Sequence, residues 1–536
     1  MPPRRPLTLV VFITIVTSII FVARYGGDGQ NLATFPIGKS KTPEEPSCTE
    51  HLGWLEPYQF TYPIKYASRD IVTNPIEGMK RPSVTTVDAP LFKNIKTVDL
   101  TGSVVTRMEH CPPPLIVDVT ARPMGKTDAA NMMFGLQTTI GRLKDTVKHL
   151  ARWLPHTGAQ LFCIVIDSKD GKEVAADERE MAKVQKAMRD MGIRATVMHP
   201  VRPIIKDKKS DSFAQRYFSL VNVMYAHRDS KTQWITLIDD DTFFPSMFDL
   251  QAMLAKHDST TPQYIGSLSE DWWAVNHYGL MGFGGAGVIL SVPMAGILDN
   301  HTEECKENLR TTAGDISIMD CVYRYSPAKL THIPELHQVD MHGDLSGFYE
   351  SGRDILSLHH WKEGSAAGYK LEMEKMHLVA DVCDNCFLQR WNFNDQVVLS
   401  NGFSIVEYPS GLLSGKSTGV LSVVPGREAE RLDLDRMEET WADAINVLHS
   451  LAPTRSKLDE RQKVSYKLLD SMVVDEFGAS TGKGGIVRQI YFKEGVQEIE
   501  NGPRGMDTVF VLNWRDGRTT FDGNGIPKTA GEIKQG

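Results

Sequence analysis

Three consecutive aspartates at the end of an apolar run constrain this chain more than any other feature of its sequence. The run Gln233–Ile238 has the length of a strand and carries apolar residues on both faces, as buried parallel strands do. Asp239, Asp240 and Asp241 follow it directly. Their mutual repulsion would destabilise the fold unless a positive group lies beside them. Hard divalent cations such as Mn²⁺ or Mg²⁺ prefer oxygen ligands, and ligands bind beyond the carboxyl ends of strands in open α/β sheets.

The first hypothesis is therefore a metal ion at a strand end, holding a phosphorylated substrate. The simpler alternative is a solvated acidic turn that caps the helix expected after Pro245, because Asp and Thr are good helix caps. A third interpretation is the Asp-x-Asp-x-Thr motif of haloacid-dehalogenase-like phosphatases. Here Thr242 follows the last aspartate directly and Phe243 comes next, which argues against an aspartyl-phosphate enzyme.

The overall composition is that of a globular protein. The chain has 536 residues, of which 41% are hydrophobic and 24% charged, and this length leaves room for two or three domains. The net charge of -8 and the absence of a long basic run argue against nucleic acid as a partner.

The N-terminal region predicts a membrane anchor followed by a stem. Leu7–Ala23 is apolar and uncharged, and Arg4 and Arg5 before it favour a cytoplasmic N-terminus. We expect a cytoplasmic tip and a transmembrane signal anchor over 1–24 and a Gly- and Pro-punctuated stem over 25–110. The protein would then be a single-pass type II protein of the Golgi or endoplasmic reticulum membrane, with its body in the lumen. If the run is a cleaved signal peptide, a soluble secreted hydrolase is the alternative.

From about residue 130 the apolar pattern alternates between strand and helix. This alternation predicts an α/β fold with a mainly parallel sheet flanked by helices, over 111–390. Short apolar alternations in 391–536 predict a small β-rich accessory region. The expected strands are 132–137, 161–166 and 193–198, and the expected helices are 142–154, 173–191 and 213–226.

The seven cysteines fit a luminal setting, in which pairs form disulfides. Cys305 and Cys321 are expected to bridge the segment around Asp315, and Cys383 and Cys386 to form a tight local bridge. The odd count leaves one thiol free, and Cys163 in an apolar strand run is our choice.

Several short motifs recur in a recognisable order around the three aspartates. Four glycines lie within Gly282–Gly287, where backbone can approach a ligand closely, although a tight turn explains this cluster equally well. The ordered set is Gly-Leu-Gln-Thr-Thr at 135–139, the Trp234–Thr242 strand and acids, Tyr-Ile-Gly-Ser at 264–267, Phe-Gly-Gly-Ala-Gly at 283–287, Gly-Asp at 314–315 and Leu-His-Gln-x-Asp at 336–340. Over residues 110 to 410 this order resembles the Fringe-like glycosyltransferases of the family-31 group, most closely their fungal members.

The resemblance implies a Rossmann-like GT-A fold and an inverting, metal-dependent transfer of a hexosyl or N-acetylhexosaminyl group. The donor would be a nucleotide-diphosphate sugar, typically a UDP-sugar, and the acceptor a glycan or glycoprotein. By position, Asp315 matches the catalytic base, and the metal site would use Mn²⁺, with Mg²⁺ as the alternative. The matching metal ligands are Asp239, Asp241 and His337, and the matching donor-binding residues are Thr138, Thr139, Arg142, Asp239, Asp240, Gly284 and Gly285.

Some of these assignments keep an alternative. Asp315 also suits a helix cap for 316–325. His359, in the segment Ser357–Trp361, competes with His337 for the metal. Trp272 and Trp273 fit a sugar-stacking platform or ordinary core packing. A catalytically inactive glycan-binding relative of the same fold is the alternative for the whole chain.

Overall fold

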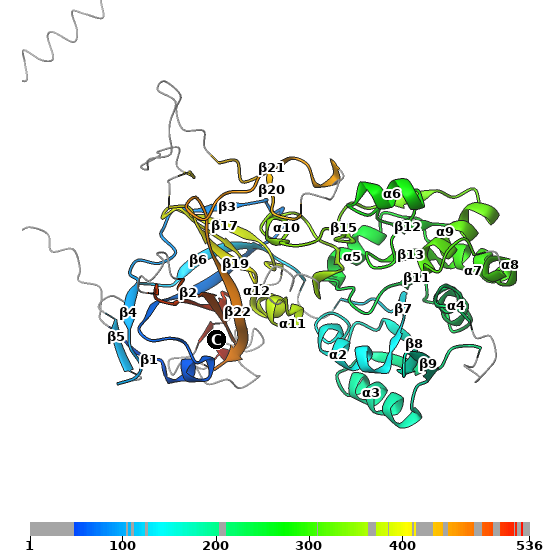
Figure 1. Cartoon of the computed structure of the whole chain (residues 1–536), viewed down its shortest axis with the longest axis horizontal. Helices are drawn as coiled ribbons and strands as arrows, with labels where there is room; N and C mark the ends of the chain where they lie inside the picture. The colour runs from blue at the N-terminus through cyan, green and yellow to red at the C-terminus, as the bar shows by residue number, and fades with distance from the viewer. Residues whose placement is uncertain are drawn as a thin grey trace, which may run out of the picture. The chain divides into compact units, whose positions relative to one another are not determined.

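Two large β-sheets organise the structure (Figure 1), which is a computed structural model. Thr49–Met108 and the chain from Pro112 onward group into one compact unit. The residues that the structure describes are 48–102, 105–108, 112–123, 127–202, 211–307, 309–362, 371–383, 385–409, 412–413, 432–442, 449–475, 485–496, 504–518, 520–521 and 527–528.

The first sheet carries the acidic run at one strand end. Its strands lie in the order β10-β8-β7-β11-β13-β12-β14, with β9 paired to β8. Neighbours from β10 to β11 are parallel, but β13 is antiparallel to both β11 and β12. The strands are β7 (Met132–Thr139), β8 (Gln160–Lys169), β9 (Lys172–Ala175), β10 (Arg194–Met198), β11 (Trp234–Leu237), β12 (Tyr264–Gly266), β13 (Val288–Ser291) and β14 (Leu330–His332).

The expectation of a mainly parallel sheet is therefore wrong, and the sheet is mixed. The α/β class and the expected strands and helices of its first half are confirmed by β7, β8 and β10 and by α2 (Ile140–Leu150), α3 (Glu178–Asp190) and α4 (Phe213–Ala226). The parallel pattern breaks where the glycine-rich segment before Val288 reverses the chain direction and inserts β13 between β11 and β12.

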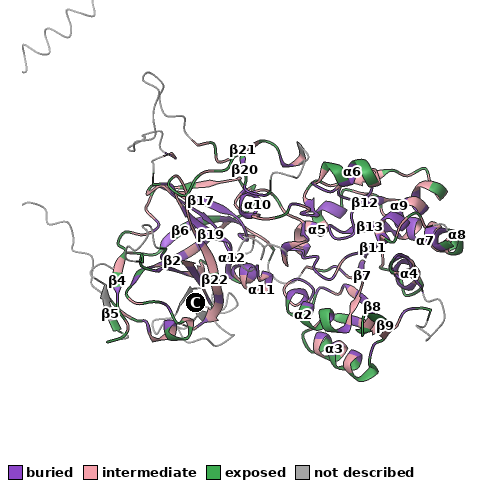
Figure 2. Ribbon diagram, viewed as in Figure 1, coloured by how far each residue is buried: buried purple, intermediate pink, exposed green. Residues whose placement is uncertain are grey.

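Helices cover both faces of this sheet, which explains why its strands are apolar on both faces. Along β8, Leu161 and Cys163 pack on the side of α2 and α3, and Phe162 and Ile164 pack on the side of α4. The remaining helices of this half are α5 (Met247–Leu254), α6 (Trp272–Tyr278), α7 (Val292–Asn300), α8 (Thr302–Glu307) and α9 (Gly314–Tyr325). Figure 2 shows the strands largely buried and much of α3 and α6 exposed.

The second sheet combines strands that precede the first sheet in the sequence with strands that follow it. Its order is β3-β17-β18-β19-β22-β23-β24-β2-β4, with β6 paired to β2. Its strands are β2 (Ile64–Ile76), β3 (Thr85–Val87), β4 (Lys96–Val98), β6 (Leu115–Thr120), β17 (Arg390–Phe393), β18 (Val397–Ser400), β19 (Ser404–Glu407), β22 (Val464–Val474), β23 (Ile486–Lys493) and β24 (Thr508–Asp516).

β2 lies parallel to β24, from Lys65 opposite Thr508 to Thr73 opposite Asp516. The part of 25–110 that the structure describes, expected as a stem, thus supplies strands to the same sheet as the C-terminal region. Smaller elements are β1 (Cys48–His51), η1 (Gly53–Tyr58), β5 (Val105–Met108), β15 (Leu336–His337), α10 (Ser346–Tyr349), β16 (Ser357–Leu358), β20 (Met437–Glu439), η4 (His449–Leu451), β21 (Thr454–Ser456), β25 (Thr520–Phe521) and β26 (Pro527–Lys528).

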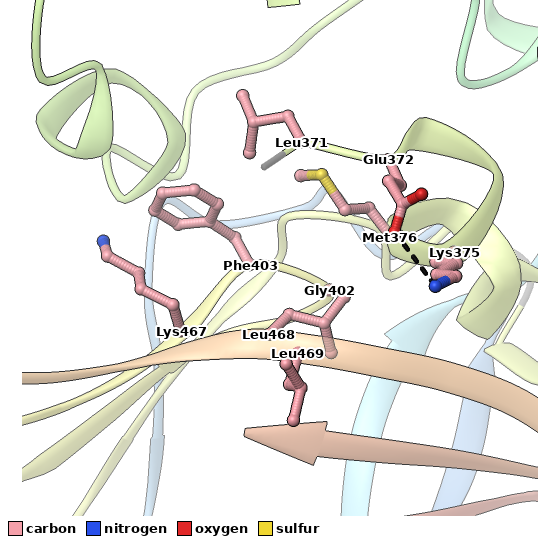
Figure 3. A pocket seen from close by; sticks show the side chains of 9 residues that line it. All are labelled: Leu371, Glu372, Lys375, Met376, Gly402, Phe403, Lys467, Leu468 and Leu469. Atoms are coloured by element: carbon pink, nitrogen blue, oxygen red, sulfur yellow. Dashed lines mark ion pairs between the residues drawn. The ribbon is translucent and has the colours of Figure 1, made fainter. Parts of the chain in front are cut away.

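Three short helical turns lie between the sheets: α11 (Met373–Met376), η3 (His377–Val379) and α12 (Ala380–Cys383). α11 contacts both α2 and β22. Beside α11 is a very small cavity of about 20 Å³, part of whose wall is apolar (Figure 3). Lys375 at its rim pairs with Glu372 at 2.9 Å and with Asp470 at 3.1 Å. None of the residues expected in the functional site lines this cavity.

The cysteine expectations are confirmed. Disulfides join Cys305 to Cys321 and Cys383 to Cys386, and Cys163 is free and buried. The expected anchor, Leu7–Ala23, lies outside the described residues. Within the part of the chain that the structure describes, no helix is long and apolar enough to span a bilayer.

Candidate functional site

The turn after β11 places the three aspartates at the edge of the first sheet. Asp240 and Asp241 are buried, while the Asp239 side chain keeps 37% of its surface exposed. Thr242 holds the turn in shape, because its hydroxyl accepts the Asp239 N–H at 2.9 Å and donates to the carbonyl of Gly285 at 2.8 Å. The glycine-rich segment and the acidic turn are thereby fixed against each other.

Asp240 points to the start of α2 and holds the donor-side residues expected from the sequence. The guanidinium of Arg142 donates two hydrogen bonds to the carboxylate of Asp240, and the hydroxyl of Thr138 donates to the same carboxylate. Thr139 caps α2 by accepting the N–H of Arg142 at 3.3 Å. Asp240 is thus neutralised by a cation of the protein itself, which leaves its two neighbours as the acids in need of a partner.

Asp239 and Asp241 share a histidine, His359. Its Nε2 lies 3.3 Å from Asp239 Oδ2 and 3.1 Å from Asp241 Oδ1. Burial would lower the pKa of His359, but the hydrogen bonds and charges of both aspartates raise it to about 10. Burial would raise the pKa of Asp241, but the hydrogen bond and charge of His359 outweigh it and hold this pKa well below its usual range.

His337 lies apart from these carboxylates, although its strand runs beside that of His359. In the parallel pair β15–β16, His337 stands opposite Leu358, so its side chain shares the face of Leu358 and not that of His359. Its Nδ1 lies 3.3 Å from a carboxylate oxygen of the buried Glu270, and its ring packs on Phe348. Leu358 in turn pairs with Phe243, which brings His359 to the acidic turn.

Two carboxylates and an imidazole at a strand end form a donor set that suits Mn²⁺. In the described part of the chain, no group of three or more His, Cys, Asp or Glu side chains is already arranged around a metal position. Asp239 and Asp241 instead each contact His359, as expected where a proton on the imidazole balances the two negative charges. Because metal binding to such ligands releases a proton, this set fits a divalent cation chemically.

Asp315 lies beside this cluster at the first turn of α9. Its Oδ2 accepts the N–H of Gly284 at 3.2 Å, and its Oδ1 accepts the N–H of Ile316 at 2.9 Å. Burial raises the pKa of Asp315 to about 6, and the charge of Asp239 adds to this effect. The helix-cap alternative is wrong, because α9 begins at Gly314 with Ala313 as its N-cap and no side-chain cap hydrogen bond, and Asp315 lies within the first turn.

A cavity of about 360 Å³, within the range that small ligands occupy, opens in front of the acidic turn, while Asp315, Gly284 and Gly285 do not line it. It joins the start of α2, the acidic turn and the His359 segment. Its lining residues are Gln137, Thr138, Thr139, Arg142, Ile164, Ile166, Glu173, Phe213, Arg216, Asp239, Asp240, Asp241, His359 and His360.

Three features of the site escaped the sequence analysis. Tyr217 lies in the helix expected over 213–226, and its ring lies under both Gly284 and Gly314. Gln338 accepts the N–H of Ala286 at 2.9 Å and so holds the glycine-rich segment from the other side. The indole of Trp361 donates to the backbone carbonyl of Asp241.

Trp272 and Trp273 stand exposed on α6, at 48% and 57% of their surface, so core packing does not account for them. The inner face of α6 packs through Ala274 on Phe283 and Ile316, the neighbours of Gly284 and Asp315. The two indoles thus lie on a helix that is anchored next to the site.

Replacing Gly285 by alanine should weaken Mn²⁺ binding, because a Cβ at this position would lie 2.1 Å from Nδ1 of His359 and force the imidazole away from the aspartates. Titration of the purified protein with Mn²⁺ by calorimetry measures the change. Gly102→Ala is the control, since a Cβ there meets nothing within 4 Å. Equal Mn²⁺ affinity in both variants would show that the position of His359 does not matter to the metal.

Comparison with known proteins gives limited matches. A family profile described as "Protein of unknown function, DUF604" matches residues 274–376. A search of curated proteins finds no match. Among solved structures, a mannosyltransferase from Pyrobaculum calidifontis in complex with GDP-Man and Mn²⁺ is 12% identical with a TM-score of 0.25, over 40% of this chain and 59% of that one.

Two further similar structures are also glycosyltransferases. GlyE from Streptococcus pneumoniae is 16% identical with a TM-score of 0.24, over 38% of this chain and 45% of that one. Mouse xyloside xylosyltransferase 1 is 11% identical with a TM-score of 0.25, over 38% of this chain and 84% of that one. The chain thus spans about half the length of the first two structures, and with TM-scores this low the function has to be argued from the site itself.

Proposed function

We propose that this chain is a metal-dependent glycosyltransferase that uses a nucleotide-diphosphate sugar, of the UDP-sugar class, and acts by inversion. The observation that supports it most is the meeting of Asp239, Asp241 and His359 at a strand end, with the separate carboxylate of Asp315 tied to the same site through Gly284. Asp239 and Asp241 suit the binding of a cation, and Asp315 suits the acceptance of a proton. The order of motifs along the sequence points to the same reaction class.

In this proposal, Asp239, Asp241 and His359 hold Mn²⁺, with Mg²⁺ as the alternative, and His359 takes the place that position alone assigned to His337. The cation supplies Lewis-acid stabilisation of the diphosphate leaving group. Arg142, held by Asp240 and 60% exposed, presents its guanidinium to the donor cavity. Thr138 and Thr139 line the same cavity beside it.

Asp315 is the proposed general base. It takes the proton from the acceptor hydroxyl while that oxygen forms a bond to the anomeric carbon and the bond from this carbon to the diphosphate oxygen breaks. Attack on the face opposite the leaving group inverts the anomeric centre. A pKa near 6 lets the carboxylate be ionised at neutral pH yet remain a stronger base than an ordinary aspartate.

The acceptor is proposed to be a glycan or glycoprotein, and the exposed Trp272 and Trp273 fit the apolar face of a sugar ring. Location in the Golgi or endoplasmic reticulum membrane through Leu7–Ala23 is a proposal from the sequence. It is supported by the two disulfides, which suit an oxidising compartment.

The test is donor hydrolysis by the purified protein across a panel of nucleotide sugars, with Mn²⁺ and with EDTA. We expect one donor class to release its nucleoside diphosphate only when Mn²⁺ is present. Binding of glycans without binding of any nucleotide sugar would favour the alternative, an inactive glycan-binding relative. NMR of the transferred product then checks inversion.

A further inference from the structure

Tyr217 carries a buried hydroxyl group that no described residue satisfies. The residue lies in α4 and is only 2% exposed, and its hydroxyl oxygen has no hydrogen-bond partner in the structure. Burying an unpaired hydroxyl destabilises a fold, and a phenylalanine would fill the same space without that cost. The hydroxyl is therefore free to donate a hydrogen bond to a bound ligand.

The surroundings of Tyr217 point to such a ligand. A Cβ on Gly284 would lie 2.6 Å from the Tyr217 hydroxyl oxygen and 3.7 Å from Asp239 Oδ1, so these two groups lie close to each other beside Gly284. A Cβ on Gly314 would lie 2.3 Å from the Tyr217 ring, so Gly314 is needed for the ring to reach that far. Both positions require glycine because Tyr217 packs beneath them.

Asp315 lies beside the same glycine, since it follows Gly314 and accepts the N–H of Gly284. Burial, together with the charges of Asp239 and Asp315, keeps the pKa of Tyr217 well above its usual range, so the phenol stays protonated. A neutral phenol beside two carboxylates is a hydrogen-bond donor for an oxygen atom that enters between them.

Resting on the proposed function, we propose that the Tyr217 hydroxyl and the Asp239 carboxylate together bind one hydroxyl group on the sugar ring of the nucleotide-sugar donor. A sugar hydroxyl can accept a hydrogen bond from Tyr217 and donate one to Asp239 at the same time. A deoxy, O-methyl or fluoro substituent at that ring position lacks one or both of these bonds. Tyr217 would thus select donors by a free hydroxyl at this position, independently of the nucleotide.

The variant Tyr217→Phe removes only the hydroxyl, and calorimetry in the presence of Mn²⁺ compares two probes. We expect the affinity for the nucleotide sugar to fall about tenfold, as for one lost hydrogen bond, and the affinity for the nucleoside diphosphate alone to stay unchanged. Tyr349→Phe is the matched control. Tyr349 is also buried with an unpaired hydroxyl, but it packs on Phe348 and Phe403, away from the aspartates.

The outcomes separate this inference from the proposed function. An equal loss for both probes, or no loss for either while the wild type binds both, would overturn the role of Tyr217 as a sugar contact. A wild type that binds neither probe would instead overturn the proposed function. A second measurement does not depend on whether a variant folds, because monodeoxy donors are tested on the wild-type protein. One of them should show the same tenfold loss, and combining it with Tyr217→Phe should add no further loss.

Discussion

Asp241→Asn should abolish Mn²⁺-dependent donor binding and sugar transfer while the protein stays folded. The substitution keeps the size of the side chain but removes one of the two negative charges that meet at His359. The backbone at this position is held by the indole of Trp361, which does not depend on the carboxylate. Because a divalent cation contributes several kcal/mol to stabilising the leaving group, transfer should fall about 10³-fold or more.

The measurement is Mn²⁺ and donor affinity by calorimetry beside the transfer rate. His359→Gln should lose Mn²⁺ affinity in the same way, whereas His337→Gln should keep it, since His337 faces Glu270 and not the aspartates. Undiminished Mn²⁺-dependent turnover in Asp241→Asn would remove the metal assignment. Loss of metal in His337→Gln but not in His359→Gln would reverse the choice of histidine.

Asp315→Asn should leave donor and Mn²⁺ affinity intact and lower transfer by about two to four orders of magnitude, the usual contribution of a general base. The amide oxygen can still accept one of the two N–H groups that Asp315 accepts, from Gly284 and Ile316. Asp315 is not the N-cap of α9, and an amide has nearly the same size as a carboxylate, so the fold should persist. Transfer near the wild-type rate would place the base elsewhere, with Asp340 or Asp344 the next candidates.

The pH profile gives a second signature of the same group. A base works only when deprotonated, and the pKa of Asp315 is raised to about 6. The wild-type rate should therefore fall as the pH drops through about 6, and Asp315→Asn should lack this limb. Asp320→Asn is the control, because Asp320 lies on the same helix but pairs with Arg310 at the surface. A wild-type profile that is flat from pH 5 to 8 would contradict the assignment.

Local patterns were enough to predict the parts of the fold in which neighbours in sequence are neighbours in space. The strand into Asp239 and the helix at Phe213–Ala226 follow from apolar periodicity and turn signals. The antiparallel insertion of β13 does not, because an apolar run carries no mark of strand direction. The pairing of β2 with β24 does not follow from local patterns either, since the sequence of a strand does not indicate which distant strand it pairs with.

The site shows the same limit. The acidic turn could be located from the sequence because it follows directly from a strand, and the roles of Thr138, Arg142 and Asp315 stay predictions from motif. The choice between His337 and His359 could not be made from the sequence, because a shift of one residue in the register of β15 and β16 decides which side chain faces the aspartates. Tyr217 could not be recognised either, since aromatic residues are common on the buried face of a helix. Its position under Gly284 and Gly314, which are distant in sequence, is visible only in the structure.

The parallel pairing of β2 with β24 also orders events during synthesis on the ribosome. Asp70 and Asn513, which are hydrogen-bonded across it, are 443 positions apart, and the whole first sheet is translated between them. β2 must therefore wait with an unpaired edge until Thr508–Asp516 has emerged, and contacts of such high sequence separation form slowly. A nascent chain that stalls or is cut after β14 would contain the strands of the first sheet, while one edge of β2 stays unpaired. Such a chain is prone to aggregation until chaperones cover that edge.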